Sequence, residues 1–299
     1  TIKPTFPADS PFSTGTYKLV GLTCTGKEIH SQEIPISICP DDIDNDGIID
    51  NIDIDNDNDG ILNCTESFGN EDINLINLNS GSLSVGSYTY SGIVSTTGNT
   101  ASTPFVGASN GTILSEIPNK TGTLESSATY TLTFNKSLNL QFEYATSTSL
   151  GNGLLTNDEE FIIQVPNTKT ITLVDPDDQL LVDTNYDGIY ETGVTQISSF
   201  EIRFKLNGAS LNIGSGTFKF VANSVDAITY KHKNNSDTTD NQATFKISAT
   251  CIPKDSDNDN FQDALDYDSD NDGIPDYIEV NGMNNILSGV DTDANGLDD

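Results

Sequence analysis

Between residues 67 and 250, short apolar or alternating stretches are separated by clusters of Asn, Gly, Asp and Pro. Alternation with a period of two predicts half-buried β-strands, and short apolar runs bounded by turn residues are typical of buried strands. Within this interval no helical period continues for ten residues. The pattern therefore predicts strands at 130–134, 138–144, 160–165, 169–174, 200–206, 216–221, 226–232 and 243–248.

The number and shortness of these strands indicate the fold class. Many short strands joined by polar turns predict an all-β fold, an antiparallel β-sandwich of jelly-roll-like character, over residues 67–252. A segment of about 180 residues can bury an adequate core. Two more strands are predicted at 15–22 and 33–38. Because an isolated hairpin is only marginally stable, we interpret residues 1–40 as the C-terminal strands of a preceding β domain.

Two segments outside this pattern carry a concentrated negative charge. The chain has 45 Asp and Glu residues against 13 Lys and Arg, and about half of the acids lie in residues 41–66 and 253–299. These segments, named the first and second connectors, repeat one another: Asp255–Glu279 aligns without a gap on Asp42–Glu66, 213 residues earlier. A solvated acidic tail needs no fixed spacing. The repeat therefore predicts a structural function for the acids.

The acids of both connectors follow the spacing of a twelve-residue calcium loop. Such a loop takes side-chain oxygens at positions 1, 3, 5 and 12, a backbone carbonyl at 7, a residue at 9 that often acts through water, and Gly at 6. Four segments fit: loop 1 (Asp42–Asp53), loop 2 (Asp55–Glu66), loop 3 (Asp255–Asp266) and loop 4 (Asp268–Glu279). In loop 3, Asn260 replaces the glycine, and Asn tolerates positive φ.

The expected ligands are all oxygen donors, which suits a hard cation, so we predict Ca²⁺, two ions per connector. They are Asp42, Asp44, Asp46, Ile48, Asp50, Asp53, Asp55, Asp57, Asp59, Ile61, Asn63, Glu66, Asp255, Asp257, Asp259, Phe261, Asp263, Asp266, Asp268, Asp270, Asp272, Ile274, Asp276 and Glu279. A fifth loop starts with Asp291, Asp293, Asn295 and Leu297, and the sequence stops at Asp299, before position 12. We expect Ile48, Ile52, Ile61, Phe261 and Ile274 to cover a small core between the ions.

The step of 13 residues from loop to loop distinguishes among calcium motifs. An EF-hand needs a helix on each side of its loop, and this step leaves no room for one. The stretches DIDNDGIIDNIDIDNDNDG and DYDSDNDGIPDYIE resemble thrombospondin type-3 repeats. The resemblance covers about 60 residues and implies calcium-wrapped segments with little regular secondary structure, in which the Asp and Glu residues named above are ligands. The family often staples its repeats with disulfides, whereas Cys64 is the only cysteine inside these loops.

One further segment matches the loop pattern only in part. Asp183, Asn185, Asp187, Gly188, Ile189 and Glu191 match positions 1, 3, 5, 6, 7 and 9, but position 12 is Val194. The same residues are good hairpin-turn formers. A turn without metal and a weak calcium site are both compatible with this sequence, and the turn is favoured.

Charge and motifs exclude several functions. A formal net charge of −32 excludes a nucleic-acid binder held by phosphate contacts and argues against docking on an anionic membrane. No apolar run is long enough for membrane insertion, and no apolar signal segment opens the chain. Nucleophile, zinc-protease and phosphate-loop motifs are absent. Asp158, Glu159 and Glu160 are interpreted as a solvated loop, so no enzyme is expected.

The four cysteines suggest disulfides in a secreted protein. Cys64 and Cys251 bracket the central β domain, whose ends should lie close together. We favour Cys64–Cys251 with Cys24–Cys39. The pairing Cys39–Cys64 is the main alternative, and reduced buried thiols remain another. His30 and His232 have no nearby partner motif and are expected to be surface strand residues.

These features together suggest an extracellular, non-enzymatic structural protein. Calcium-bearing connectors between β domains resemble, in style, the very large cell-surface adhesins of gliding Bacteroidota. We expect a calcium-stiffened segment that spaces and presents β-sandwich domains, with neighbouring domains of the same chain, and surface glycans or other cells, as partners. The alternative is a calcium-dependent carbohydrate-binding module. The absence of Trp weakens that alternative, because sugar sites usually expose aromatic rings.

Overall fold

The computed structural model describes residues 40–122, 124–145, 150 and 154–282, and before them the backbone of four short strands. β1 (Gly15–Tyr17) pairs with β4 (Ile34–Ile36), and β2 (Val20–Leu22) pairs with β3 (Glu28–His30), both antiparallel. The stretch predicted as one strand at 15–22 thus holds two. The proposed Cys24–Cys39 pair, the side chain of His30 and the fifth loop, from Asp291, lie outside the described residues.

The regular secondary structure of the described chain is almost entirely antiparallel β, which confirms the predicted fold class. Its elements are β5 (Glu71–Asp72), β6 (Ser80–Ser82), β7 (Thr89–Thr97), β8 (Phe105–Gly107), β9 (Thr112–Ile117), β10 (Ser126–Tyr144), β11 (Leu155–Thr156), β12 (Glu159–Gln164), β13 (Ile171–Val174), β14 (Leu180–Val182), β15 (Gln196–Ser199), β16 (Glu201–Leu206), β17 (Ser210–Leu211), β18 (Lys219–Asn234), β19 (Asn241–Ala249), the 3₁₀ turn η1 (Asp263–Leu265) and α1 (Asp276–Asn281). Among the described residues we find no helical segment with the length and apolarity that crossing a membrane requires.

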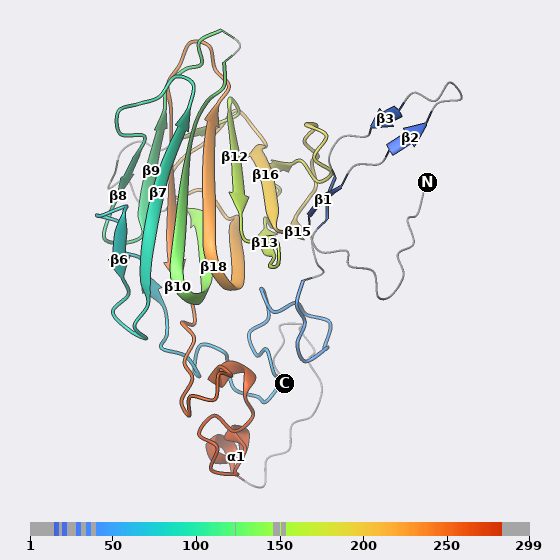
Figure 1. Ribbon diagram of the computed structural model, residues 1–299, viewed down its shortest axis with the longest axis vertical. Helices are drawn as coiled ribbons and strands as arrows, with labels where there is room; N and C mark the ends of the chain where they lie inside the picture. The colour runs from blue at the N-terminus through green and yellow to red at the C-terminus, as the bar shows by residue number, and fades with distance from the viewer. Residues whose placement is uncertain are drawn as a thin grey trace.

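Two long strands organise the fold. β10 and β18 pair with each other along most of their length and run side by side through the molecule (Figure 1). The first half of β10 pairs with β7 and its second half with β19. The C-terminal half of β18 pairs with β12 and its N-terminal residues with β13. Both strands therefore change neighbours part-way, and the ribbon that they form belongs to both layers of a sandwich-like fold.

The change of neighbours coincides with irregular pairing. The register between β10 and β18 shifts between Thr133 and Leu140, where residues 135–137 are exposed. On β18 the corner contains Ser224, whose φ of 52° is rare for a residue other than glycine. Bulges bend strands in this way and allow one strand to serve two sheets. The alternation breaks at both corners, which is why each strand is predicted from sequence as two.

The core between the layers is rich in aromatic side chains. The ring centroids of Phe142 and Phe245 lie 4.7 Å apart, those of Phe142 and Tyr230 5.1 Å, and those of Phe161 and Phe204 5.2 Å. All five side chains are almost completely buried. Burial of each such ring contributes roughly 2–3 kcal/mol. The β domain therefore has a core of its own, made without any connector residue.

A polar cluster inside this core corrects two sequence predictions. Glu159 and His232 are both 0% exposed, so neither a solvated loop nor a surface position describes them. Glu159 Oε1 lies 3.2 Å from His232 Nε2, across the paired strands β12 and β18. His232 Nδ1 lies 2.8 Å from Ser115 Oγ, which also contacts the Tyr230 hydroxyl at 2.9 Å. The polar neighbours of these groups lie on other strands, a relation that local sequence does not display.

Both connectors lie at one end of the β domain (Figure 1). The incoming and outgoing segments pair where they meet the sheet, through Phe68 N to Ile252 O at 2.9 Å and Ile252 N to Gly69 O at 2.8 Å. A disulfide joins Cys64 to Cys251, with the two Cα atoms 4.3 Å apart. This confirms the favoured pairing of Cys64 and excludes Cys39–Cys64. The chain thus enters and leaves the domain through one narrow neck.

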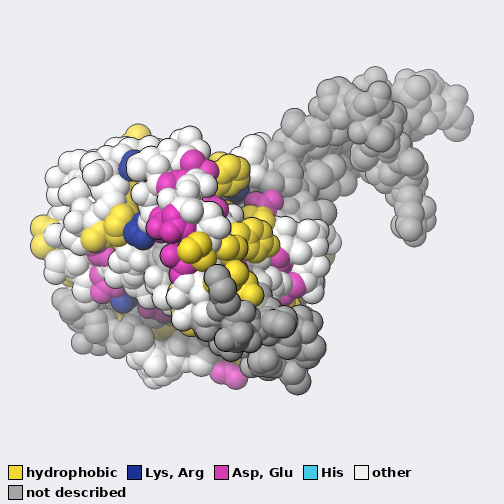
Figure 2. Space-filling view, turned by 90° about the horizontal axis from the view of Figure 1, so that it is seen from below, with side chains coloured by type: hydrophobic (Ala, Val, Ile, Leu, Met, Phe, Trp, Pro, Cys, Tyr) yellow, Lys and Arg dark blue, Asp and Glu magenta, His cyan; other side chains and the backbone are white. Residues whose placement is uncertain are grey.

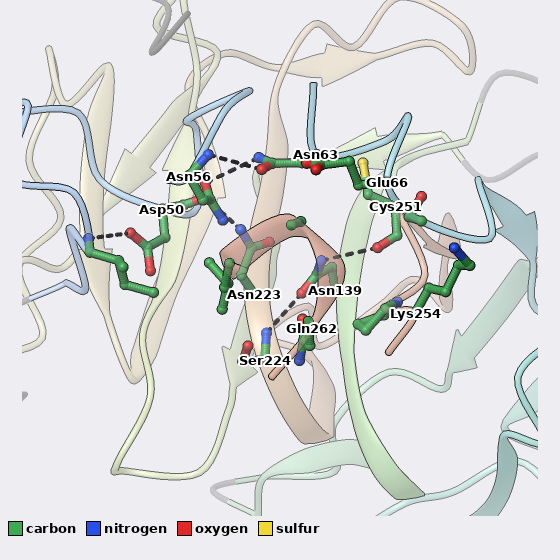
Figure 3. Close-up of a pocket in the computed structure, with 15 residues that line it drawn as sticks. Asp50, Asn56, Asn63, Glu66, Asn139, Asn223, Ser224, Cys251, Lys254 and Gln262 are labelled. Atoms are coloured by element: carbon green, nitrogen blue, oxygen red, sulfur yellow. Dashed lines mark hydrogen bonds between the residues drawn. The ribbon is translucent and has the colours of Figure 1, made fainter. Parts of the chain in front are cut away.

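The first connector also packs against the corner of the sandwich. Asn51 donates from Nδ2 to Thr172 Oγ1 at 3.0 Å and accepts from Asn223 N at 2.8 Å. Nearby, Asn139 accepts from Ser224 N at 2.9 Å and donates to Cys251 O at 3.2 Å. Figure 3 shows this small polar pocket, where side chains of both connectors face the corner strands. The corners of β10 and β18 therefore serve as the platform on which the connectors rest.

Candidate metal centre

The four connector loops share one backbone conformation. Positions 4 and 6 both have positive φ in each of them. The values are 63° at Asn45, 58° at Asn58, 65° at Asn258 and 56° at Asn271 for position 4, and 100° at Gly47, 86° at Gly60, 81° at Asn260 and 90° at Gly273 for position 6. Asn260 thus adopts the conformation expected of the glycine that it replaces. Asn at position 4 is a signal that was overlooked in the sequence, since Asn is the residue other than glycine that tolerates this region best.

Hydrogen bonds within loop 2 use one oxygen of each aspartate. Asp55 Oδ2 accepts from Gly60 N at 2.9 Å, Asp57 Oδ1 from Asp59 N at 3.2 Å, and Asp59 Oδ1 from Ile61 N at 2.8 Å. The other oxygen of each, together with both oxygens of Glu66, is buried and has no hydrogen-bond partner. Buried polar atoms are nearly always paired. Five unpaired carboxylate oxygens in one small loop therefore form a donor set that fits a cation.

The same donor grouping recurs in the other three loops. In each loop, oxygens of the carboxylates at positions 1, 3 and 5 lie within 4.8 Å of one another. Burial differs: in loop 2 all three side chains are buried, whereas the sets in loops 1, 3 and 4 are partly exposed. Seen from the connector end, acidic side chains gather near the middle of this face, beside exposed hydrophobic ones (Figure 2). Several acidic clusters that could hold metal ions are therefore present.

The residues at positions 9 and 12 also make hydrogen bonds to the backbone of the connectors. At position 9, side-chain oxygens accept from the position-2 amide of the same loop. These bonds are Ile43 N to Asp50 at 3.0 Å, Asn56 N to Asn63 at 2.9 Å, Ser256 N to Asp263 at 2.7 Å and Ser269 N to Asp276 at 3.0 Å. At position 12, Asp53 accepts from Asp55 N at 2.9 Å and Asp266 from Asp268 N at 3.1 Å. Position 9 therefore closes each loop, and position 12 links one loop to the next.

The prediction that five apolar side chains of the connectors cover a small core between the ions is only partly correct. Ile61 is 7% exposed and packs inside the first connector, and Ile48 and Ile52 are half-buried. Phe261 is 62% exposed and Ile274 is 40% exposed, so these two do not shield an ion. One short helix, α1, begins at Asp276 inside loop 4, where the sequence predicts irregular structure. Pro275 precedes it, a residue suited to the first turn of a helix.

No protein-family model, curated protein or solved structure matches the chain. The chemistry of the connectors therefore rests on their own geometry.

Burial and mutual repulsion make the loop 2 carboxylates hard to ionise without a cation. The pKa of Glu66 is raised to about 9, first by burial and then by the charges of Asp59 and Asp57. The pKa of Asp57 is raised to about 8 by burial and by Asp59 and Asp55. Burial also raises the pKa of Asp53, the last residue of loop 1, to about 7. A divalent cation would reverse this balance, because it stabilises the ionised forms that burial disfavours.

The partial match at Asp183 has the same backbone fold as the connector loops. Tyr186 and Gly188, at positions 4 and 6, have φ of 60° and 84°. Asp183 accepts from Asp187 N and Gly188 N, both at 3.1 Å, so both of its oxygens are paired. Glu191 accepts from Thr184 N at 2.9 Å, as position 9 does elsewhere. The turn is thus closed by hydrogen bonds of the same kind as those that close the connector loops.

The pKa shifts predict opposite pH responses with and without calcium. In the ion-free protein the folded loop 2 binds protons that the unfolded chain has released, so its stability is fully present below pH 4 and is lost as the pH rises through about 6 to 9. In calcium, protons compete with the ion, so order in loop 2 is instead lost at low pH. The amide signal of Gly60, followed by NMR with chelator and with calcium, checks this. The same direction of change in both series would contradict it.

Proposed function

We propose that the two connectors bind Ca²⁺ and that the protein is a calcium-stiffened, non-enzymatic structural segment of a secreted cell-surface adhesin, spacing and presenting β domains. The observation that carries the calcium proposal is the set of buried, unpaired carboxylate oxygens of loop 2. Their number favours calcium, which takes six to eight oxygen ligands in flexible geometry, over magnesium, which keeps several waters. Zinc and copper prefer His or Cys.

The mechanical part of the proposal follows from charge. Without an ion, the carboxylates of each connector repel, by about 1 kcal/mol for two charges 4 Å apart in water and by more where water is excluded. Shared coordination replaces this repulsion, so the free energy of calcium binding becomes free energy of folding for the connector. The Cys64–Cys251 disulfide is compatible with an oxidising extracellular location. Neighbouring domains of a longer chain, and surface glycans or other cells, are the proposed partners.

Calorimetric titration and small-angle X-ray scattering test this function. We expect several calcium ions to bind the wild-type chain, and the radius of gyration to be smaller in millimolar calcium than in excess chelator. The double variant Asp44→Asn with Asp57→Asn should lose the ions of the first connector, because one carboxylate is removed from each of its loops. Asp177→Asn, an exposed residue in the turn between β13 and β14, is the control and should behave as wild type.

The β-sheet signal in circular dichroism should persist in chelator, since the aromatic core contains no connector residue. Two results would overturn the proposal: no heat of calcium binding by the wild-type chain, or an identical radius of gyration and flexibility with and without calcium.

A further inference from the structure

Three carboxylates from both connectors converge on one point. Oxygens of Asp59 and Glu66, in loop 2, and of Asp276, in loop 4, lie within 4.8 Å of one another. Asp276 is separated from the other two by more than 200 residues of sequence. Its neighbours in this group are therefore set by tertiary packing and not by the spacing of a loop.

The oxygens that loop 2 contributes to this point are buried and unpaired. Asp59 is 2% exposed, and its Oδ2 has no hydrogen-bond partner. Both oxygens of Glu66 are buried and unpartnered as well. The nearby Lys254, in the second connector, pairs with Asp263 at 2.8 Å. Carboxylates brought together in this way repel unless a cation lies between them.

Independent contacts hold the two connectors in this arrangement. The Tyr267 hydroxyl of the second connector donates to Asp57 O of the first at 2.8 Å. The Cys64–Cys251 disulfide ties the chain together where both connectors leave the domain. The approach of Asp276 to loop 2 is thus part of a larger contact between the connectors.

We propose that Asp59, Glu66 and Asp276 form a composite calcium site, in which the second connector supplies Asp276 to the ion held by loop 2. The site rests on the proposed function, since it requires that loop 2 binds calcium. Loop 2 offers the side chains of Asp55, Asp57, Asp59 and Glu66 and the carbonyl of Ile61, and a donor from Asp276 fits the six to eight that calcium accepts. Asp276 also accepts hydrogen bonds from Ser269, and each carboxylate oxygen has a second lone pair for an ion.

A calcium ion at the composite site would be bound by both connectors and would hold them together. Binding at loop 2 orders loop 4, and the order of loop 4 raises the affinity of loop 2, because coupling between two sites is reciprocal. The two connectors would then become rigid together and not one by one.

The test compares Asp276→Asn with wild type and with the control Asp177→Asn. The asparagine keeps an oxygen that accepts from Ser269 and removes the charge. Loop 4 should keep its ion, because Asn already stands at position 9 of loop 2, as Asn63. Calcium titration is expected to show the same number of ions in Asp276→Asn, with the affinity of loop 2, followed through the Gly60 amide signal, lowered about tenfold, a factor typical of coupled sites. Hydrogen exchange provides the reciprocal measurement: Asp57→Asn, in the first connector, should lower the protection of the α1 amides measured in calcium.

The outcomes separate the two proposals. A wild-type chain that binds no calcium refutes the proposed function itself. A wild-type chain that binds calcium refutes the composite site alone if Asp276→Asn keeps the calcium affinity of loop 2 within twofold, or if Asp57→Asn leaves the α1 protection unchanged. A lowered calcium affinity of loop 2 in Asp276→Asn, together with reduced protection of the α1 amides in Asp57→Asn, supports the composite site.

Discussion

Replacing Cys64 and Cys251 together by serine is expected to lower the free energy of unfolding of the β domain by about 5 kcal/mol, the largest effect that we predict. The bridge closes a loop with a sequence separation of 187 residues. In the chain-entropy description, a cross-link of that length removes about 5 kcal/mol of conformational freedom from the unfolded chain. Urea unfolding followed by the β-sheet signal, in the presence of calcium, measures the change.

The single variant Cys64→Ser is a useful companion, because it breaks the same bond while keeping one thiol. It should unfold at nearly the same urea concentration as the double variant, and reducing agent should destabilise the wild-type chain by a similar amount. A loss below about 1 kcal/mol in the double variant would show that the unfolded chain gains little freedom from the open bridge.

The second large effect is expected at the buried Glu159–His232 pair. Glu159→Ala leaves His232, which is 0% exposed, without its carboxylate, and it also removes the acceptor that Glu159 provides for Thr156 N. Removing one partner of a buried pair costs roughly 3–5 kcal/mol. Urea unfolding again gives the measurement, and calcium should not alter the difference, since the pair lies within the β domain.

Two further variants make this prediction specific. The adjacent Glu160 is 15% exposed and pairs with Lys233, which is 26% exposed, at 3.2 Å, so Glu160→Ala should cost less, about 1–2 kcal/mol. The apolar double variant Glu159→Leu with His232→Phe leaves no buried charge unpaired and should lose less stability than Glu159→Ala alone. Equal losses for Glu159→Ala and Glu160→Ala would contradict the assignment of the stability to the buried pair.

The strands could be predicted where alternation is local, as in β12, β16 and β19. The continuity of the long strands β10 and β18 could not be predicted. β10 and β18 each look like two strands in the sequence, since the corner residues 135–137 and 223–224 are polar, and nothing local records that hydrogen bonding continues around the bend. β7 was missed because only two of its residues, Tyr90 and Gly92, are buried, and Gly92 has no side chain to add to an apolar pattern. β9 was missed because its buried positions include Ser115, whose partners come from other strands.

The candidate metal site, like the strands, could be predicted from the sequence only in part. The donors of each loop are neighbours in the sequence, so their spacing alone brings positions 1, 3 and 5 together, as the structure shows for all four loops. Sequence spacing assigns Asp276 only to loop 4. Its place beside Glu66 depends on how the two connectors pack, and that depends on the neck and on Tyr267. The burial of the loop 2 carboxylates, which distinguishes this loop from the other three, also depends on tertiary packing and could not be predicted from the spacing.

The position of the neck determines how a pulling force would travel along the chain. Tension applied at the two connectors passes from one to the other directly through the Cys64–Cys251 bond, because the bond joins the incoming and outgoing segments. The β domain lies outside this path, so the force does not pass through its strands. The 187-residue span from Cys64 to Cys251 represents roughly 650 Å of extended chain, which cannot be drawn out while the bond is intact. A protein exposed to shear could thus remain short and keep its β domain folded until a reducing agent opens the bridge.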